Sequence, residues 1–304
     1  MQKFYDVIIV GAGPAGLSCS ITLVKNKKTC LVLEYGADVN GTICGDGLSV
    51  HSITLLGKLG IDIEKLGGKK VKNKKEYFNG SVRTVKFSDV FCLDFELGVS
   101  RDALNNSLLN YAISCGVPIF LNTPCHSISR QKDNTFLVND TFIANRVVLA
   151  CGVPSGKRFG LSYPVDLPFG ISSRIIGSCP LDDNSFHYFY SDALGNGYAW
   201  VFPVDDNTWN VGVWSQNKCK NLAKTYSQLE KNYFGSANII YERKPKGRII
   251  GAGNGTKIDT KGYICIGDCN LDASISSGEG VSYALESGIQ AALLLVNGNQ
   301  IPEA

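Results

Sequence analysis

The sequence has 304 residues, of which 44% are hydrophobic and 19% are charged, and its formal net charge is +3. This length predicts about two domains with a sizeable core, and the mixing of acidic with basic residues argues against a nucleic-acid partner. No apolar stretch reaches the length of a membrane span, and no signal peptide fits before the first predicted strand, so we expect a cytoplasmic protein.

The first predicted elements are an apolar strand, a tight turn and a helix. The turn reads GAGPAG, with its glycines at the spacing GxGxxG. The first glycine permits the sharp turn, the second lets the backbone approach a pyrophosphate, and the third lets the helix pack closely on the strand. The pyrophosphate would then lie at the helix N-terminus. The residues predicted to form this part of a cofactor site are Gly11, Gly13, Pro14, Ala15 and Gly16.

An acidic residue completes this unit. Glu34 ends the next predicted strand, eighteen residues after Gly16. At this position a carboxylate can accept hydrogen bonds from a ribose 2′-hydroxyl and would repel a 2′-phosphate. The unit therefore predicts a site for an adenosine diphosphate group and not for NADP.

The following segments alternate between strand and helix patterns. A basic run at residues 69–75 is interpreted as a solvated loop, with a docking patch for an acidic partner or an anionic membrane surface as the alternative. Ser100 is placed to cap a helix that begins at Arg101. Further strands are expected within residues 80–99, 117–121, 125–130, 136–138, 144–151, 186–190, 198–203, 209–214 and 262–268, and further helices up to residue 59, over 223–234 and over 278–296.

The eleven cysteines are an odd number, and most of them lie within apolar segments. Such cysteines are typical of small buried side chains in a reducing compartment. The sequence has no CxxC pair, and Cys265 with Cys269 lacks the further ligands of a zinc site, so no metal is expected.

Residues 264–288 decide which dinucleotide is predicted. An apolar strand leads to Asp268, and a helix opens after a polar loop at Gly278 and Gly280. Asp268 can bond sugar-alcohol hydroxyls, and the free N–H groups of a helix start can face an electron-rich ring edge. A flavin has both a ribityl chain and a ring edge that gains negative charge on reduction. The predicted cofactor is therefore FAD, although each of these residues alone is also compatible with an ordinary loop.

The order of the segments predicts how the domains are arranged. Aromatic, β-rich segments separate the parts that carry the cofactor motifs. We therefore expect an α/β protein in which a Rossmann-like FAD-binding domain is interleaved with an antiparallel β-sheet substrate domain. The FAD-binding domain is expected to comprise residues 1–75, 100–165 and 247–298, and the substrate domain residues 76–99 and 166–246.

Several motifs together resemble one family. They are GAGPAG with Glu34, CGDGLS at residues 44–49, VSR at 99–101, residues 147–155, YAWVFP at 198–203 with NVG at 210–212, and IGD at 266–268 through GEG at 278–280. In this order they resemble the geranylgeranyl reductase family of the p-hydroxybenzoate hydroxylase-like FAD superfamily over nearly the whole chain. CGD and YAWVFP are the more specific motifs, and the others are shared with flavin monooxygenases and halogenases.

The resemblance implies where individual residues lie. Arg101 would lie near the FAD phosphates or ribityl chain, and Asp268 would contact the ribityl chain or pyrophosphate. The residues that would lie at the isoalloxazine ring are Cys44, Gly45, Asp46, Gly47, Gly278, Glu279 and Gly280. The aromatic residues expected to line a substrate cavity are Tyr188, Tyr190, Trp200 and Phe202, although a buried Trp200 or Phe202 is equally compatible with an ordinary sandwich core.

The predicted function is reduction of a carbon–carbon double bond by hydride transfer from reduced FAD, on an apolar substrate that could be an isoprenoid. One alternative is an FAD-dependent monooxygenase or halogenase of a small organic substrate. Another is a flavin-binding electron carrier or regulator without a substrate cavity. No second GxGxxG follows a strand, so the external electron donor would be transiently bound NAD(P)H or a redox protein.

Such a reductase must also protonate the carbon opposite the one that receives hydride. Cys44 is predicted to be the residue closest to the chemistry, with an inert cysteine chosen for its size as the alternative. Asp46 could donate a proton only if burial raised its pKa, so it is predicted mainly to fix the loop.

Overall fold

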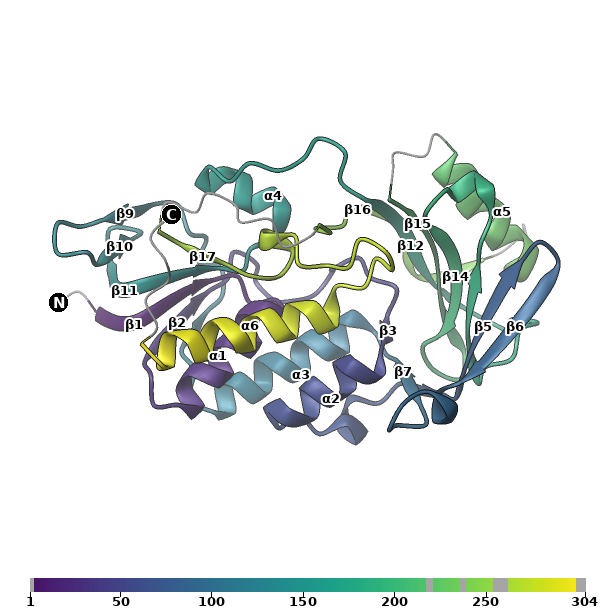
Figure 1. Cartoon of the computed structure of the whole chain (residues 1–304), viewed down its shortest axis with the longest axis horizontal. Coiled ribbons are helices and arrows are strands. Elements are labelled where there is room, and N and C mark those ends of the chain that lie inside the picture. Colours follow the sequence, from purple (N-terminus) through teal and green to yellow (C-terminus); the bar gives the residue numbers. More distant parts are fainter. Residues whose placement is uncertain (1–2, 217–220, 236–238, 254–261, 299–304) are drawn as a thin grey trace.

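The computed structural model of this chain describes residues 3–216, 221–235, 239–253 and 262–298. Two seven-stranded sheets lie at opposite ends of an elongated molecule, and a small three-stranded sheet lies between them (Figure 1). This arrangement confirms the predicted α/β fold class. Within the described residues, no helix has both the length and the apolar character that crossing a membrane requires.

The first large sheet carries the glycine turn. Its strands, in spatial order, are β8 (Ile119–Phe120), β2 (Cys30–Leu33), β1 (Lys3–Val10), β11 (Phe142–Leu149), β10 (Phe136–Val138) and β9 (Ile128–Arg130), and β17 (Ile264–Cys265) also pairs with β11. β1 is parallel to β2 and β11, and β17 is parallel to β11. The segments that follow β1, β2, β11 and β17 therefore meet at one edge of the sheet, although they are far apart in sequence.

Four helices lie together on one face of this sheet (Figure 1). They are α1 (Pro14–Lys25), α2 (Val50–Leu59), α3 (Arg101–Ser114) and α6 (Val281–Val296). α6 packs closely on α1 because Gly288 has no side chain: a Cβ there would lie 2.1 Å from Ser18 Oγ. Ser100 Oγ accepts a hydrogen bond from Ala103 N, which confirms the predicted cap of α3.

The second large sheet contains the aromatic segments. Its strands, in spatial order, are β16 (Ile240–Ile249), β12 (Phe169–Ile176), β15 (Thr208–Ser215), β14 (Tyr198–Pro203), β13 (Ser185–Phe189), β5 (Asn73–Phe78) and β6 (Ser81–Lys86). Neighbouring strands are antiparallel except β13 and β5, which are parallel.

The two faces of this second sheet have different partners. Side chains alternate between the faces of a strand, and in β14 Ala199 and Val201 pack in the core beneath α5 (Leu222–Phe234), whereas Trp200 and Phe202 belong to an aromatic cluster. The alternation in YAWVFP therefore determines which aromatic rings can reach a cavity on the face opposite α5.

The small sheet joins the two parts of the molecule. β7 (Glu96–Gly98) lies between β3 (Gly47–Leu48) and β4 (Lys69–Val71) and is antiparallel to both. A short helix, α4 (Gly152–Gly156), follows β11. The small sheet places residues 44–49 and Glu96 near each other.

Two expectations about the chain differ from the structure. The predicted strand pattern in residues 80–99 holds for β6 and β7 only, because Phe87–Asp89 form a 3-10 turn that buries Phe87 and residues 90–95 are in turns and bends. The basic run is not a solvated loop but forms β4 and the start of β5.

Acidic residues from elsewhere explain why the basic run can form strands. Lys69 Nζ lies 2.6 Å from Asp183 Oδ2 and 2.9 Å from Asp206 Oδ1. Lys75 Nζ lies 2.6 Å from Asp182 Oδ2. The predicted domain boundary between residues 75 and 76 falls inside β5, all of which pairs within the second sheet; the domain limits remain a prediction.

Candidate functional site

A cavity of about 1740 Å³ is lined by residues of both large sheets. A typical site for one small ligand or cofactor occupies roughly 300–1,000 Å³, so this cavity has room for two molecules. Its wall contains all the predicted site residues except Gly16 and Asp46. The structure therefore brings together motifs from both ends of the sequence.

The glycine turn lies at one end of this cavity. Gly11 has φ +110°, and a Cβ there would lie 2.6 Å from Ala150 O. A Cβ on Gly16 would lie 2.0 Å from Gly11 O, so Gly16 permits packing and does not itself line the cavity. A Cβ on Gly13 would meet no atom within 4 Å, so at this position the backbone is open to a ligand.

Two helix N-termini at the cavity lack side-chain caps. α1 begins after Gly13 and α6 after Gly280, and in neither helix does a cap side chain accept a hydrogen bond. Both glycines line the cavity. Free N–H groups and the helix dipole favour a negatively charged or electron-rich group at such positions. The site therefore fits a pyrophosphate at α1 and the polar edge of a ring at α6.

Glu34 is held at the cavity wall by two backbone donors. Its side chain follows β2, and the residue is 7% exposed. Oε2 accepts a hydrogen bond from Ala12 N at 2.7 Å, and Oε1 accepts one from Gly36 N at 3.0 Å. A carboxylate has about four acceptor positions, so Glu34 can still accept hydrogen bonds from ribose hydroxyls.

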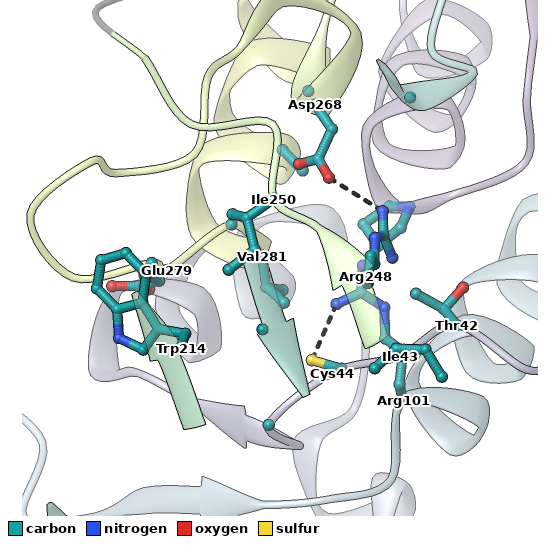
Figure 2. Close-up of a pocket in the computed structure, with 18 of the residues that line it drawn as sticks. Thr42, Ile43, Cys44, Arg101, Trp214, Arg248, Ile250, Asp268, Glu279 and Val281 are labelled. Carbon is teal, nitrogen blue, oxygen red and sulfur yellow. Dashed lines mark hydrogen bonds and ion pairs between the residues drawn. The ribbon is translucent and has the colours of Figure 1, made fainter. Parts of the chain in front are cut away.

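Asp268 has a partner that the sequence did not indicate. Arg248 Nη2 lies 3.0 Å from Asp268 Oδ2, and both residues line the cavity (Figure 2). Arg248 belongs to β16 in the second sheet, whereas Asp268 follows β17 in the first. The pair therefore connects the two sheets across the cavity wall.

The backbone carbonyl of Cys44 is bound by three side chains. Cys44 O accepts hydrogen bonds from Ser172 Oγ at 3.1 Å, Asn210 Nδ2 at 2.8 Å and Arg243 Nη2 at 3.0 Å. All three donors come from the second sheet. Arg101 Nη1 donates to Cys44 Sγ at 3.5 Å (Figure 2). The loop position of Cys44 is thus determined from outside the loop.

The structure does not bring the carboxylate of Asp46 to the cavity. Asp46 is 2% exposed and has φ +59°. Its Oδ1 accepts a hydrogen bond from Arg101 N at 2.9 Å, and its Oδ2 accepts one from Asn210 Nδ2 at 2.6 Å. Burial raises the pKa of Asp46, and the guanidinium groups of Arg243 and Arg174 oppose that rise. These contacts support a loop-fixing role for Asp46.

Aromatic rings of the second sheet line the cavity and pack against the predicted ring-side motifs: a Cβ on Gly45 would lie 3.4 Å from Trp200, and one on Gly278 would lie 3.1 Å from Trp214. Trp200 Nε1 donates to Asn210 Oδ1 at 2.8 Å, and the Trp200 ring fills the space where a Cβ of Gly212 would lie, 2.1 Å from Cζ2. Phe202 packs against Tyr188, with ring centroids 4.9 Å apart. The predicted aromatic residues that line the cavity are Tyr188, Tyr190, Trp200 and Phe202, and those not predicted include Phe186, Tyr198 and Trp214.

Sequence reasoning missed several polar residues of this site. Arg174 is a charged residue within the strand FGISSRII, and a charge in such a strand was a usable signal of a buried partner. Asn210 lies within the NVG motif, but no function was assigned to it. The remaining missed residues are Glu96, Ser172, Arg243 and Arg248, for which we find no local sequence signal.

Comparison with known proteins agrees with the geometry. Residues 4–139 match a family model described as an FAD binding domain, which confirms FAD as the cofactor. A menaquinone reductase from Mycobacterium tuberculosis is 24% identical over 95% of this chain and 76% of its own length. Digeranylgeranylglycerophospholipid reductase 1 from Methanococcoides burtonii is 25% identical over 96% of this chain and 74% of its own length.

A solved structure shares the fold. It is a geranylgeranyl bacteriochlorophyll reductase-like protein from Thermoplasma acidophilum, with a TM-score of 0.83 and 20% sequence identity, over 98% of this chain and 79% of that one. At this identity the likeness concerns the fold alone. A fold does not determine a reaction, so the choice of chemistry depends on the site.

Proposed function

Because the chain is an FAD-dependent oxidoreductase that resembles the geranylgeranyl reductase family, we propose that it reduces a carbon–carbon double bond of an isoprenoid substrate. The observation that carries this proposal is the group of aromatic residues that line the same cavity of about 1740 Å³ as the cofactor motifs. The relative from Methanococcoides burtonii supports it, because the name of its substrate contains two geranylgeranyl groups.

The residues present fit FAD. The start of α1 would bind the pyrophosphate, Glu34 the ribose hydroxyls, Asp268 the ribityl chain, and Gly278 to Gly280 the ring edge. Bound FAD, once reduced, supplies hydride. The external electron donor is proposed to be NAD(P)H or a redox protein.

The remaining work of the protein is to orient the substrate and exclude water. The aromatic cluster is apolar and closely packed, and Trp200 is 7% exposed while Phe202 is 6% exposed. Such walls place a flat or chain-like apolar substrate without competing for its polar groups. Cys44 would lie beside the reacting carbons, on a loop fixed through Asp46 and the three donors to its carbonyl.

We expect the reduced protein to transfer hydride to a prenyl alkene. The protein is reduced without oxygen, mixed with geranylgeraniol, and followed by the return of oxidised-flavin absorbance and by mass spectrometry of the alcohol. Gain of two hydrogens per flavin oxidised supports the proposal. If the alkene is ignored, and an organic substrate instead accelerates the reaction with oxygen, the protein is a monooxygenase or halogenase.

We also propose contact with an anionic membrane at the mouth of the cavity. Val90 is 58% exposed and Phe91 is 47% exposed, yet both line the cavity, so they lie where it opens. Phe78, at the end of β5, is also exposed, and Arg83 of the neighbouring strand β6, which lies opposite Glu76, has a side chain that is 77% exposed. Apolar side chains next to a cation are typical of a surface that inserts into a lipid interface.

The double variant Val90→Ser with Phe91→Ser should bind vesicles containing anionic lipid at least about tenfold more weakly than the unaltered protein, because two apolar side chains no longer insert. Vesicle flotation measures this binding. Val165→Ser is the matched control, since Val165 is 87% exposed and does not line the cavity. Equal binding by all three proteins would contradict the proposed membrane contact.

A further inference from the structure

Glu96 lies on the cavity wall and has no role in the site described so far. It is the first residue of β7, and its carboxyl group interacts electrostatically with Glu279 and Lys74, which also line the cavity. The backbone N–H of Val50, the first residue of α2, hydrogen-bonds to the same carboxyl group. Ser49, which precedes Val50, donates to Glu279, so both glutamates interact with the start of α2.

Glu279 is the member of this pair that is surrounded by donors. Its Oε1 accepts hydrogen bonds from Ser49 Oγ at 2.5 Å and from Ser282 Oγ at 2.6 Å. Ser49 is also the N-cap of α2, so the positive end of that helix faces the pair. Within the described residues, no side-chain hydroxyl donates a hydrogen bond to Glu96.

The surroundings raise the pKa of Glu96, so its acid form is present near neutral pH. Burial is the main cause, the negative charge of Glu279 is the second, and together they raise the pKa of Glu96 to about 7. The N–H of Val50 and the ammonium of Lys74 act in the opposite direction. Tyr188 also faces the carboxyl group, and burial holds its own pKa well above the usual value. Two carboxyl groups whose environments separate their pKa values are typical of sites in which one of the two acts as the acid.

We propose that Glu96 is the proton donor to the substrate during double-bond reduction, an assignment that rests on the proposed function. In this step the carbon–carbon π bond breaks. One carbon receives hydride with its electron pair from the reduced cofactor, and the other receives the proton of the Glu96 carboxyl group. The remaining carboxylate then takes up a proton from water.

The geometry favours this carboxyl group over the thiol of Cys44. Arg101 donates to Cys44 Sγ, so at that contact the sulfur acts as an acceptor, towards a cation. Glu96, in contrast, feels the negative charge of Glu279, which favours the protonated form of its carboxyl group. If the role of Glu96 were only structural, its side chain would accept a hydrogen bond from the Val50 N–H at the start of α2. A glutamine side chain can accept that hydrogen bond too.

The test compares Glu96→Gln with Cys44→Ser. Both variants are first checked for unchanged thermal unfolding and FAD content. Infrared titration then measures the protonated carboxyl band: we expect a band that disappears with a midpoint near pH 7 in the unaltered protein and is missing from Glu96→Gln. This measurement needs no substrate.

The second readout is the pH profile of anaerobic flavin reoxidation by geranylgeraniol. For the unaltered protein the rate should be constant below pH 7 and fall about tenfold per pH unit above it, since the acid form is lost. Glu96→Gln should react at least about 10²-fold more slowly at pH 6, without that fall, whereas Cys44→Ser should still show the alkaline fall, whatever its absolute rate.

Several outcomes would overturn the assignment. A Glu96→Gln profile equal to that of the unaltered protein, or loss of the alkaline fall in Cys44→Ser instead, removes Glu96 as the donor while leaving the proposed function intact. A carboxyl group already ionised at pH 5 does the same. If the unaltered protein does not reduce geranylgeraniol at all, the proposed function itself fails, and the role of Glu96 fails with it.

Discussion

Replacing Arg174 by methionine is expected to lower the free energy of unfolding by about 3–5 kcal/mol, because the buried Asp46 loses one of its two neighbouring cations and the partly buried Asp102 loses its ion-pair partner. Arg174 is 4% exposed. Its Nη2 lies 2.6 Å from Asp102 Oδ2, its Nε 3.5 Å from Glu242 Oε2, and its Nη1 3.8 Å from Asp46 Oδ2. Urea unfolding followed by tryptophan fluorescence measures the change.

A surface arginine provides the control for that variant. Arg146 is exposed, and its Nη1 donates to the backbone oxygen of Asn145. Arg146→Met should change stability by no more than about 0.5 kcal/mol. An equal loss in both variants would mean that the cluster around Arg174 contributes nothing specific. A loss confined to Arg174→Met would show that the ion pairs beneath the Cys44 loop stabilise the whole fold.

Gly16→Ala is expected to abolish FAD retention. The added Cβ would lie 2.0 Å from Gly11 O and 3.3 Å from the Cβ of Ala150. Neither neighbour is the far end of a flexible side chain, so β1, α1 and the turn between them would have to separate. Overpacking of this kind costs roughly 1–3 kcal/mol, and the shift would move the N–H groups that we propose to bind the pyrophosphate. The ratio of flavin to protein absorbance after gel filtration is the measurement.

Gly57→Ala tests whether the effect is specific to the turn. Gly57 lies inside α2, and a Cβ there would meet no atom within 4 Å. Alanine is favoured over glycine in a helix by about 1 kcal/mol, so this variant should keep FAD and become slightly more stable. Full FAD retention by Gly16→Ala would instead show that the helix and strand can separate without loss of the site.

Much of the cofactor half of the site could be predicted because its signals are local. The glycine turn, Glu34 and the cap at Ser100 each depend on residues within one strand–turn–helix unit. The strand pattern failed for residues 90–95, where alternating apolar residues lie in turns and bends instead of a strand. Alternation of apolar and polar residues indicates that one side of a segment is buried and the other is exposed. Turns at the mouth of a cavity have such an environment, as a strand at the surface of a sheet does.

The basic run shows a second limit of local reasoning. Seven residues with five lysines were interpreted as a solvated loop, yet they form parts of two strands. The acids that pair with Lys69 are Asp183 and Asp206, more than a hundred positions away in sequence. Sequence composition alone does not reveal such partners, because charge pairing depends on which strands become neighbours.

The sequence by itself determined the FAD fingerprint, because the glycine turn and Glu34 lie close together along the chain, and the order of its segments predicted two interleaved domains. Only the tertiary structure decided how the Cys44 carbonyl is fixed, since its donors Ser172 and Arg243 are 128 and 199 positions away. It alone also placed Glu96 beside Glu279. Proton affinity depends on burial and on neighbouring charge, and both arise only when distant segments pack together.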